Sequence, residues 1–285
     1  MSIKIVTDST CYIPKSISES QDISIVSLSV SFPAKTYIEE ETDYDNFYQT
    51  LSESTTLPAS SQPSLHSLIS CFENIVSAGN SVVAVFLSSL MSGTYSTALT
   101  AKDIVMKKYP QANIEIIDSK SNSMEMGLAV LAGAVTAKAE ASVKDVIDSI
   151  NYIIERSRFL FVPETLTYLK KGGRIGAASA LLGNILNIKP ILTVTDGITT
   201  VFDKVRTKKK AVEKIVDFFL EEIKEMGLGQ VVVHHINCEE EGRKLAELIQ
   251  SKIGKEKEVP VYPIGPVIGL HVGPGTIGIV YYTER

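Results

Sequence analysis

The sequence predicts an α/β protein with two lobes, the first built on a mostly parallel sheet flanked by helices and the second an α+β lobe with a mixed sheet. In the first half, short β-rich runs alternate with longer helical patterns, which is typical of βαβ units. Residues 82–87 form an uninterrupted apolar run, typical of a strand buried on both faces of a parallel sheet. In the second half, Asp196-Gly197 separates two β-rich runs and predicts an antiparallel hairpin.

The elements of the first lobe follow in chain order from these patterns. Strands are predicted at residues 3–7, within 23–32, at 82–87 and at 114–117. Helices are predicted at about residues 94–108, 124–139 and 143–155. The polar segment 60–64 (SSQPS) predicts a loop, with another helix starting near Ser64.

The second lobe begins with a short strand at residues 158–162. Helices are predicted at residues 163–171, where Gly172-Gly173 stops the helix, and at 177–186, 208–226 and 239–253. Strands are predicted at residues 188–194, 199–204, 230–235, 259–263 and 277–282. The lobes are therefore expected to comprise residues 1–157 and 158–285.

Composition excludes several classes of protein. The chain has 285 residues, of which 44% are hydrophobic and 21% charged, so it can bury a real core. A net charge of −5 argues against nucleic acid as the main partner, because phosphate contacts need clustered Lys and Arg. The basic run at residues 204–210 opens a predicted helix, and it is either a solvated helix face or a docking patch for an acidic partner.

The chain shows no sign of export or membrane insertion. Three scattered cysteines without CxxC spacing predict a reduced, cytoplasmic setting. The longest apolar stretch, residues 127–137, is far shorter than the roughly 20 residues of a membrane span. We therefore expect transient membrane contact at most.

The segment Ser92-Gly93-Thr94 is a candidate anion site. It follows the predicted buried strand and comes directly before a helix, whose N-terminus offers unpaired N–H groups and a positive dipole end. Gly93 would let a ligand approach the backbone, and the Ser92 hydroxyl would add a hydrogen bond. The alternative is that Ser92 only caps its helix.

Three further polar segments are candidates of the same kind. Ser60 and Ser61 precede the predicted N-cap residue Ser64, so their hydroxyls can face a ligand. Arg174 follows a glycine turn, where its guanidinium can pair with a carboxylate, although Gly172-Gly173 also suits a simple helix stop. His271 lies in a Gly/Pro-rich segment expected to be a loop, where a structural hydrogen bond is its commoner role.

Motifs for catalysis and for cofactors are missing from the sequence. It contains no GxGxxG opening a βαβ unit, no GxxxxGK[ST], and no Cys/His pair with zinc spacing. The adjacent His234 and His235 would point to opposite faces of a strand. Asp8 and Asp118 are conceivable metal ligands, but acidic residues at strand ends are more often turn formers. We therefore predict binding groups without a catalytic set, with no metal and no resident cofactor.

Eight segments in order resemble the bacterial DegV family over nearly the whole chain. They are residues 6–10 (VTDST), 60–64 (SSQPS), 89–95 (SLMSGTY), 117–119 (IDS), 166–176 (LTYLKKGGRIG), 189–192 (KPIL), 204–207 (KVRT) and 271–275 (HVGPG). The resemblance implies a protein that encloses a long-chain fatty acid such as hexadecanoate between two lobes. It also implies the role of fatty-acid-binding subunit of a fatty acid kinase, in which a separate ATP-dependent subunit phosphorylates the bound carboxylate for phospholipid synthesis.

The resemblance also implies roles for the candidate residues. The carboxylate-binding hydroxyls would be Ser60 and Ser92, and position 60 departs from the threonine that the family often has, with the hydroxyl kept. Arg174 and His271 would belong to the surrounding polar network, and Arg206 would lie near the surface that meets the kinase. The full predicted ligand-binding set is Ser60, Ser61, Ser92, Gly93, Thr94, Arg174 and His271.

Two other functions compete with this hypothesis. The first is a small-molecule hydrolase or phosphotransferase that uses Asp8, Ser92 or His271 in the same cleft. The second is an interaction module without a ligand, favoured by the acidic net charge and by the basic run at residues 204–210.

Overall fold

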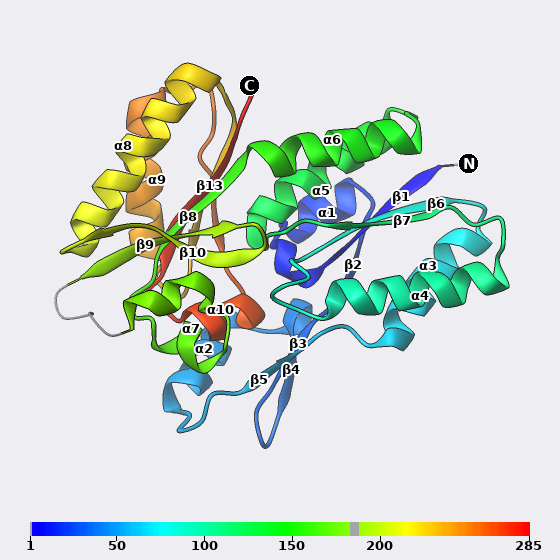
Figure 1. Ribbon diagram of the computed structural model, residues 1–285, viewed down its shortest axis with the longest axis horizontal. Coiled ribbons are helices and arrows are strands. Elements are labelled where there is room, and N and C mark those ends of the chain that lie inside the picture. Colours follow the sequence, from blue (N-terminus) through cyan, green and yellow to red (C-terminus); the bar gives the residue numbers. More distant parts are fainter. Residues whose placement is uncertain (1, 183–187) are drawn as a thin grey trace. The chain divides into compact units, whose positions relative to one another are not determined.

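The computed structural model describes residues 2–182 and 188–285, which divide into two compact units (Figure 1). Unit 1 takes the described residues up to Glu41 together with Ala59–Glu155. Unit 2 takes Thr42–Pro58 and Arg156–Arg285. Each unit is built on its own central sheet, so the predicted α/β fold class is confirmed.

A parallel four-stranded sheet forms the centre of unit 1. Its strands are β1 (Ile3–Asp8), β2 (Ile23–Val26), β6 (Ser81–Phe86) and β7 (Ile114–Asp118), in the order β2-β1-β6-β7. All three pairings are parallel, and every residue of β6 is buried. The apolar run at residues 82–87 is therefore the buried strand that its sequence predicts.

Helices cover both faces of this sheet. Val82, Ala84 and Phe86 point to one face, where they share an apolar cluster with α3 (Leu65–Ser77) and α4 (Thr94–Lys108). On the other face, α5 (Ser123–Lys138) passes between β1 and α6 (Val143–Arg156). Gly133 of α5 makes this close passage possible, because a Cβ there would stand 2.7 Å from Cδ1 of Ile150.

A small antiparallel sheet also belongs to unit 1 and carries the first candidate hydroxyls. Its strands are β3 (Ser29–Ser31), β4 (Thr36–Ile38) and β5 (Ala59–Ser61), in the order β4-β3-β5. The prediction of a loop at residues 60 and 61 is wrong, because Ser60 pairs with Val30 and Ser61 with Ser29. Helix α1 (Lys15–Ser20) and the 3-10 turns η1 (Ser9–Cys11) and η2 (Glu39–Glu41) lie in the same unit.

Unit 2 contains a mixed six-stranded sheet in the order β10-β9-β8-β13-β11-β12. Its strands are β8 (Ser157–Val162), β9 (Lys189–Thr195), β10 (Ile198–Val205), β11 (Leu228–His235), β12 (Val261–Pro263) and β13 (Ile277–Thr283). Neighbouring strands run antiparallel except β11 and β12. Asp196 and Gly197 join β9 to β10 with φ values of 49° and 84°, the left-handed pair that a two-residue hairpin requires.

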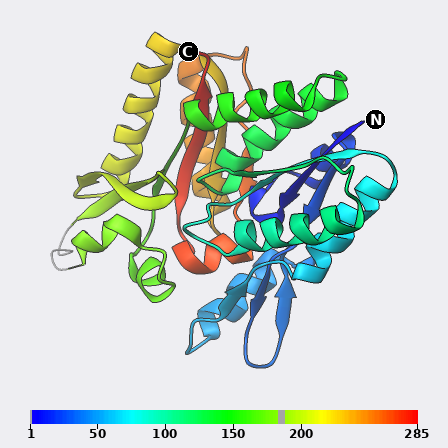
Figure 2. The same cartoon turned by 45° about the vertical axis from the view of Figure 1, so that its right-hand side comes forward.

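Two long helices pack on one face of this sheet, and the views of Figures 1 and 2 show them side by side. They are α8 (Lys208–Met226) and α9 (Glu239–Ile253), with the bounds that the sequence predicts. Phe219 of α8 and Ile249 of α9 share a core cluster with Tyr281 of β13. Within the described part of the chain, none of the helices combines the length and apolar character that a membrane crossing requires.

Two predicted helices of unit 2 are shorter in the structure. The helix predicted at residues 163–171 is confined to α7 (Thr167–Lys171), because the Thr165 hydroxyl accepts a hydrogen bond from the Thr167 N–H and forms a turn first. The helix predicted at 177–186 is a 3-10 turn, η3 (Gly176–Leu181), over its first part. Residues 183–187 of that prediction lie outside the described residues.

Residues 42–58 belong to unit 2 although they interrupt unit 1 in the sequence. They contain α2 (Tyr44–Glu53), which packs against α10 (Pro266–Val272). The Tyr48 hydroxyl donates to the carbonyl oxygens of Ile264 and Gly265, at 2.9 and 3.1 Å. The predicted single boundary between residues 157 and 158 misses this excursion, because it assigns residues 42–58 to the first lobe. The contact that places them in unit 2 joins residues 216 positions apart in the sequence.

We expect Tyr48→Phe to lower the free energy of unfolding by about 0.5–1.5 kcal/mol, the usual contribution of a buried hydrogen bond. The substitution removes the donor and leaves the Ile264 carbonyl without this partner, while the ring keeps its packing. Urea unfolding followed by circular dichroism measures the change. An unaltered unfolding curve would show that the hydroxyl does not hold α2 in place.

Candidate functional site

Two acidic residues stand at the carboxyl ends of strands in unit 1, and both form turns. Asp8 is fully buried, and its carboxylate accepts hydrogen bonds from the N–H and hydroxyl of Thr10 and from the N–H of Leu87. Burial raises the pKa of Asp8 to about 6, against the opposing effect of these hydrogen bonds. Asp118 accepts from the N–H groups of Ser89 and Lys120. Both carboxylates thus stabilise the loops that follow the strands.

The Ser92-Gly93-Thr94 segment forms the N-terminus of α4. Gly93 is the N-cap residue, and its carbonyl accepts the first helical hydrogen bond from the Thr97 N–H at 3.0 Å. The Ser92 hydroxyl lies 2.9 Å from the Thr94 hydroxyl and accepts from the Thr94 N–H at 3.3 Å. The prediction that Ser92 caps the helix is therefore wrong, because Gly93 is the N-cap residue and Ser92, one residue earlier, forms a turn with Thr94. Ser92 is half-buried and lies at the positive end of the helix dipole.

Gln62 brings the two hydroxyl segments of unit 1 together. It follows Ser60 and Ser61 of β5, and its side-chain amide donates to the Thr97 hydroxyl at 2.5 Å. Its amide oxygen rests against Gly93, so closely that a Cβ at position 93 would overlap it. Gln62, which was not predicted from the sequence, thus links the segment that carries Ser60 and Ser61 to the start of α4.

Arg174 and His271, the predicted site residues of unit 2, also lie close together. Helix α7 ends in a glycine motif in which Gly173 adopts a φ of 71° and the Arg174 N–H reaches back to the Leu169 carbonyl. This confirms the helix stop. The Arg174 guanidinium is exposed and donates to the Gly172 carbonyl at 2.6 Å.

His271 lies in the last turn of α10, so the prediction of a loop is wrong. Pro266 opens this short helix at a position where its missing N–H costs no hydrogen bond. The imidazole packs against Gly172, where a Cβ would overlap Nδ1. Burial, followed by the nearby charge of Arg174, lowers the pKa of His271 to about 4, so the ring is neutral at pH 7.

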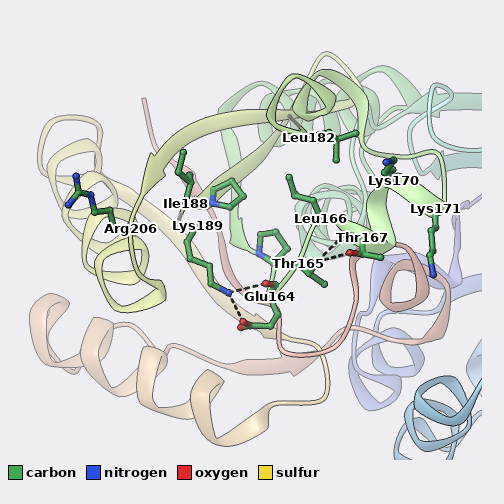
Figure 3. A pocket seen from close by; sticks show the side chains of 12 residues that line it. Glu164, Thr165, Leu166, Thr167, Lys170, Lys171, Leu182, Ile188, Lys189 and Arg206 are labelled. Atoms are coloured by element: carbon green, nitrogen blue, oxygen red, sulfur yellow. Dashed lines mark hydrogen bonds and ion pairs between the residues drawn. The ribbon is translucent and has the colours of Figure 1, made fainter. Parts of the chain in front are cut away.

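A pocket of about 830 Å³ opens in unit 2 beside α7 and β9, and Figure 3 shows its lining. Apolar side chains, among them Leu166 and Leu182, share this lining with a basic group. The basic residues are Lys170, Lys171, Lys189 and Arg206. One carboxylate, Glu164, pairs with Lys189 at 2.5 Å. The lining therefore carries an excess of positive charge.

A network of ion pairs fixes Glu164 at the edge of this pocket. Burial alone would raise the pKa of Glu164, but the hydrogen bond and charge of Lys189, with the charge of Lys208, bring it below its usual value. The Lys208 ammonium also contacts Glu241 at 2.7 Å and donates to the Gly275 carbonyl at 2.7 Å. The segment after His271 is thereby tied to α8 and α9.

The adjacent histidines of β11 contact the protein's own backbone. His234 and His235 point to opposite faces of β11, as predicted, since the first contacts the Tyr262 carbonyl and the second lies near the Cys238 N–H. In residues 2–182 and 188–285, no group of three or more His, Cys, Asp or Glu side chains is arranged to hold a metal ion.

The chain thus combines two α/β units with a helix N-terminus at which hydroxyls gather, and the free N–H groups of a helix N-terminus favour an anion. The chain belongs to the DegV family: the family model, described as an uncharacterised protein of the DegV family, matches residues 2–284. A DegV domain-containing protein of Clostridium acetobutylicum is 49% identical over 285 residues, which cover 100% of this chain and 99% of the relative.

Solved structures of the same family have the same fold. DegV of Bacillus subtilis, described as a fatty acid binding protein, superposes with a TM-score of 0.89 at 33% identity, over 99% of each chain. A stearic acid-binding protein of Eubacterium ventriosum gives a TM-score of 0.89 at 30% identity, over 99% of this chain and 98% of the other. A fatty-acid-binding DegV family protein of Thermus thermophilus gives 0.88 at 28% identity, over 99% and 100%.

Proposed function

We propose that this protein binds one long-chain fatty acid, such as hexadecanoate, with its carboxylate at the N-terminus of α4 between the hydroxyls of Ser60 and Ser92. The observation that carries the proposal is the contact of Gln62 with Gly93, which joins the β5 hydroxyl segment to the start of α4. Structural neighbours named as fatty-acid-binding proteins support the class of ligand.

The energetics of such a ligand depend on how its carboxylate is accommodated. Burying about fourteen methylenes at about 0.8 kcal/mol each gives a gross gain on the order of 11 kcal/mol. Several kcal/mol of this are lost to the ordering of ligand and protein. A carboxylate removed from water without partners would cancel much of the rest. Hydroxyls and a helix N-terminus are the partners that keep this cost low.

Arg174 and His271 complete the proposed polar network. A neutral imidazole donates or accepts a hydrogen bond without adding charge, and an exposed guanidinium pairs with a carboxylate. Their mutual proximity in unit 2 supports a shared role. The expectation that the ligand lies between the two lobes stays a prediction.

We further propose that the protein presents the carboxylate to a separate ATP-dependent kinase subunit in the cytoplasm, and that the acyl phosphate supplies phospholipid synthesis. The chain then needs no metal or cofactor of its own and makes transient membrane contact at most. The basic pocket that includes Arg206 supports an acidic docking partner. The hydrolase alternative has less support, because the Asp8 carboxylate is already committed to three hydrogen bonds.

Native mass spectrometry tests ligand binding directly. After incubation with hexadecanoate, the protein is expected to carry one fatty acid per chain, whereas hexadecane, which lacks the head group, is expected to bind far less. A chain that never carries a fatty acid, from its expression host or after incubation, would refute the proposal.

A kinase assay tests the second part of the proposal. Acyl phosphate should form only when the protein, hexadecanoate, ATP and the kinase subunit are all present. Arg206→Glu is expected to bind hexadecanoate like the parent but to lose acyl phosphate formation. Hydrolysis of ester or phosphate substrates by the protein alone, abolished in Ser92→Ala, would instead favour the hydrolase alternative.

A further inference from the structure

The side chain of Gln62 contacts Gly93 and Thr97 at the start of α4, and the roles assigned above to the candidate hydroxyls and to the helix dipole do not account for this contact. We propose that Gln62 is a positioning residue whose carboxamide holds β5 against the N-terminus of α4 and so sets the spacing of Ser60 and Ser92 at the head-group site. This inference rests on the proposed function, because a spacing matters only if a ligand bridges the two hydroxyls.

Gly93 provides the first line of evidence. Its φ of −75° is ordinary for any residue, so the backbone does not require glycine at this N-cap. The space beside Gly93 does require glycine, because a Cβ would overlap the Gln62 amide oxygen and lie 3.0 Å from the amide carbon. Gly93 thus lets Gln62 approach the start of α4.

The second line of evidence is that both the backbone and the side chain of Gln62 are held in place. Its backbone is held between β5 and α3, whose N-cap residue Ser64 accepts a hydrogen bond from the Ser67 N–H at 3.0 Å. Its side chain ends on the Thr97 hydroxyl, one turn into α4. A surface cavity of about 440 Å³ lies between the start of α3 and the first turns of α4, with Gln62 and Thr97 in its lining. The carboxamide therefore connects the two sides of this cavity.

The chemistry of the amide suits this place. An uncharged oxygen near the positive end of a helix dipole is attracted weakly and leaves the dipole available to a carboxylate. A glutamate side chain of the same length would place a competing anion beside the head group. Comparing the parent with Gln62→Glu therefore separates positioning from electrostatics, since the two side chains differ little in size.

The experiment compares Gln62→Ala, Gly93→Ala, the double variant and Gln62→Glu, with Gln49→Ala as the control for an exposed glutamine outside this region. Affinities are measured for hexadecanoate and for hexadecanol, which has the same chain and a neutral head. Each single alanine variant is expected to weaken hexadecanoate binding roughly three- to tenfold, the size of one neutral hydrogen bond. Hexadecanol binding should change less than about twofold, because a neutral head depends less on such a bond.

Coupling between the two positions is the sharpest readout. Once Gln62 is alanine, a Cβ at position 93 meets no amide, so the double variant should bind hexadecanoate no worse than either single variant. Gln62→Glu should weaken hexadecanoate binding at neutral pH and regain affinity as the pH falls and the new carboxyl is protonated.

Two outcomes overturn the inference. One is that the losses multiply in the double variant, and the other is that both ligands lose affinity equally, as they would through a general loss of structure. An unchanged Kd for Gln62→Ala, in a parent that binds hexadecanoate, refutes the positioning role alone. A parent that fails to bind hexadecanoate refutes the proposed function instead.

Discussion

Ser92→Ala is expected to weaken hexadecanoate binding by about 1–3 kcal/mol, or roughly 5- to 150-fold in Kd, and to leave the fold intact. The Ser92 hydroxyl lies at the start of α4, 2.9 Å from the Thr94 hydroxyl, where it can turn toward an anion. Alanine leaves the helix N–H groups and Gly93 in place. The variant loses one hydrogen bond to a charged oxygen, which is worth more than a bond between neutral groups, together with the weaker bond from the Thr94 N–H.

The measurement is a titration by isothermal calorimetry or by displacement of a fluorescent fatty acid, with circular dichroism to check folding. Thr100→Ala is the matched control, because Thr100 presents an exposed hydroxyl two turns further along the same helix. Its Kd should equal that of the parent. If Ser92→Ala binds hexadecanoate as tightly as the parent, the head group does not contact Ser92.

The second prediction with a large expected effect concerns Asp8, whose carboxyl makes the free energy of unfolding depend on pH. Burial raises the pKa of this carboxyl from 3.8 to about 6, so the folded protein holds the proton more tightly than the unfolded chain does. The contribution of Asp8 to stability is therefore complete below about pH 4 and is lost as the pH rises to about 6. A rise of this size corresponds to on the order of 3 kcal/mol.

Three histidines act in the opposite direction, among them His235, whose pKa burial also lowers, so the effect of Asp8 is tested as a difference in free energy of unfolding between two variants. Burial lowers the pKa of His234 and that of His271 to about 4, and both therefore favour unfolding as the pH falls from 6.5 toward 4. Asp8→Asn removes the carboxyl titration, and the loss of one acceptor oxygen adds a cost that does not depend on pH. The free energy of unfolding of the parent minus that of Asp8→Asn should fall by on the order of 2 kcal/mol between about pH 4 and pH 6, and by a little more as the pH rises to about 7.

Urea unfolding at several pH values gives this difference. Asp118→Asn is the control, because Asp118 occupies the corresponding end of β7 but lies near the surface. A difference between the parent and Asp8→Asn that stays constant across the pH range would show that Asp8 does not titrate differently in the folded protein.

The predictable part of the fold is the part with strong local patterns. The buried run of β6 and the long amphipathic helices α8 and α9 were predicted with nearly correct bounds, because periodicity alone marks them. Strand β5 was missed, since three small residues have no strand signature and their pairing partner is β3, which lies far earlier in the chain. Helix α10 was missed because Pro266, Gly269 and Gly273 look like a loop in sequence.

The candidate site was predictable by residue type and not by contact. Hydroxyls before a helix can be found in a sequence, and Ser92 indeed lies at the start of α4. The approach of Gln62 to Gly93 and of His271 to Gly172 depends on segments that meet only in the folded units. The glycines themselves were the available signal for these contacts. Sequence alone, however, does not distinguish a glycine that makes room for a neighbouring side chain from one that a turn requires.

The excursion of residues 42–58 has a consequence for biosynthesis. The chain crosses between its two units three times, after residues 41, 58 and 155, so no single cut yields two complete folding units. Helix α2 leaves the ribosome early, but the carbonyl of Ile264 that Tyr48 contacts is made 216 residues later. Unit 2 therefore cannot finish folding before Ile264 has been made, and until then α2 lacks the partner helix α10 against which it packs.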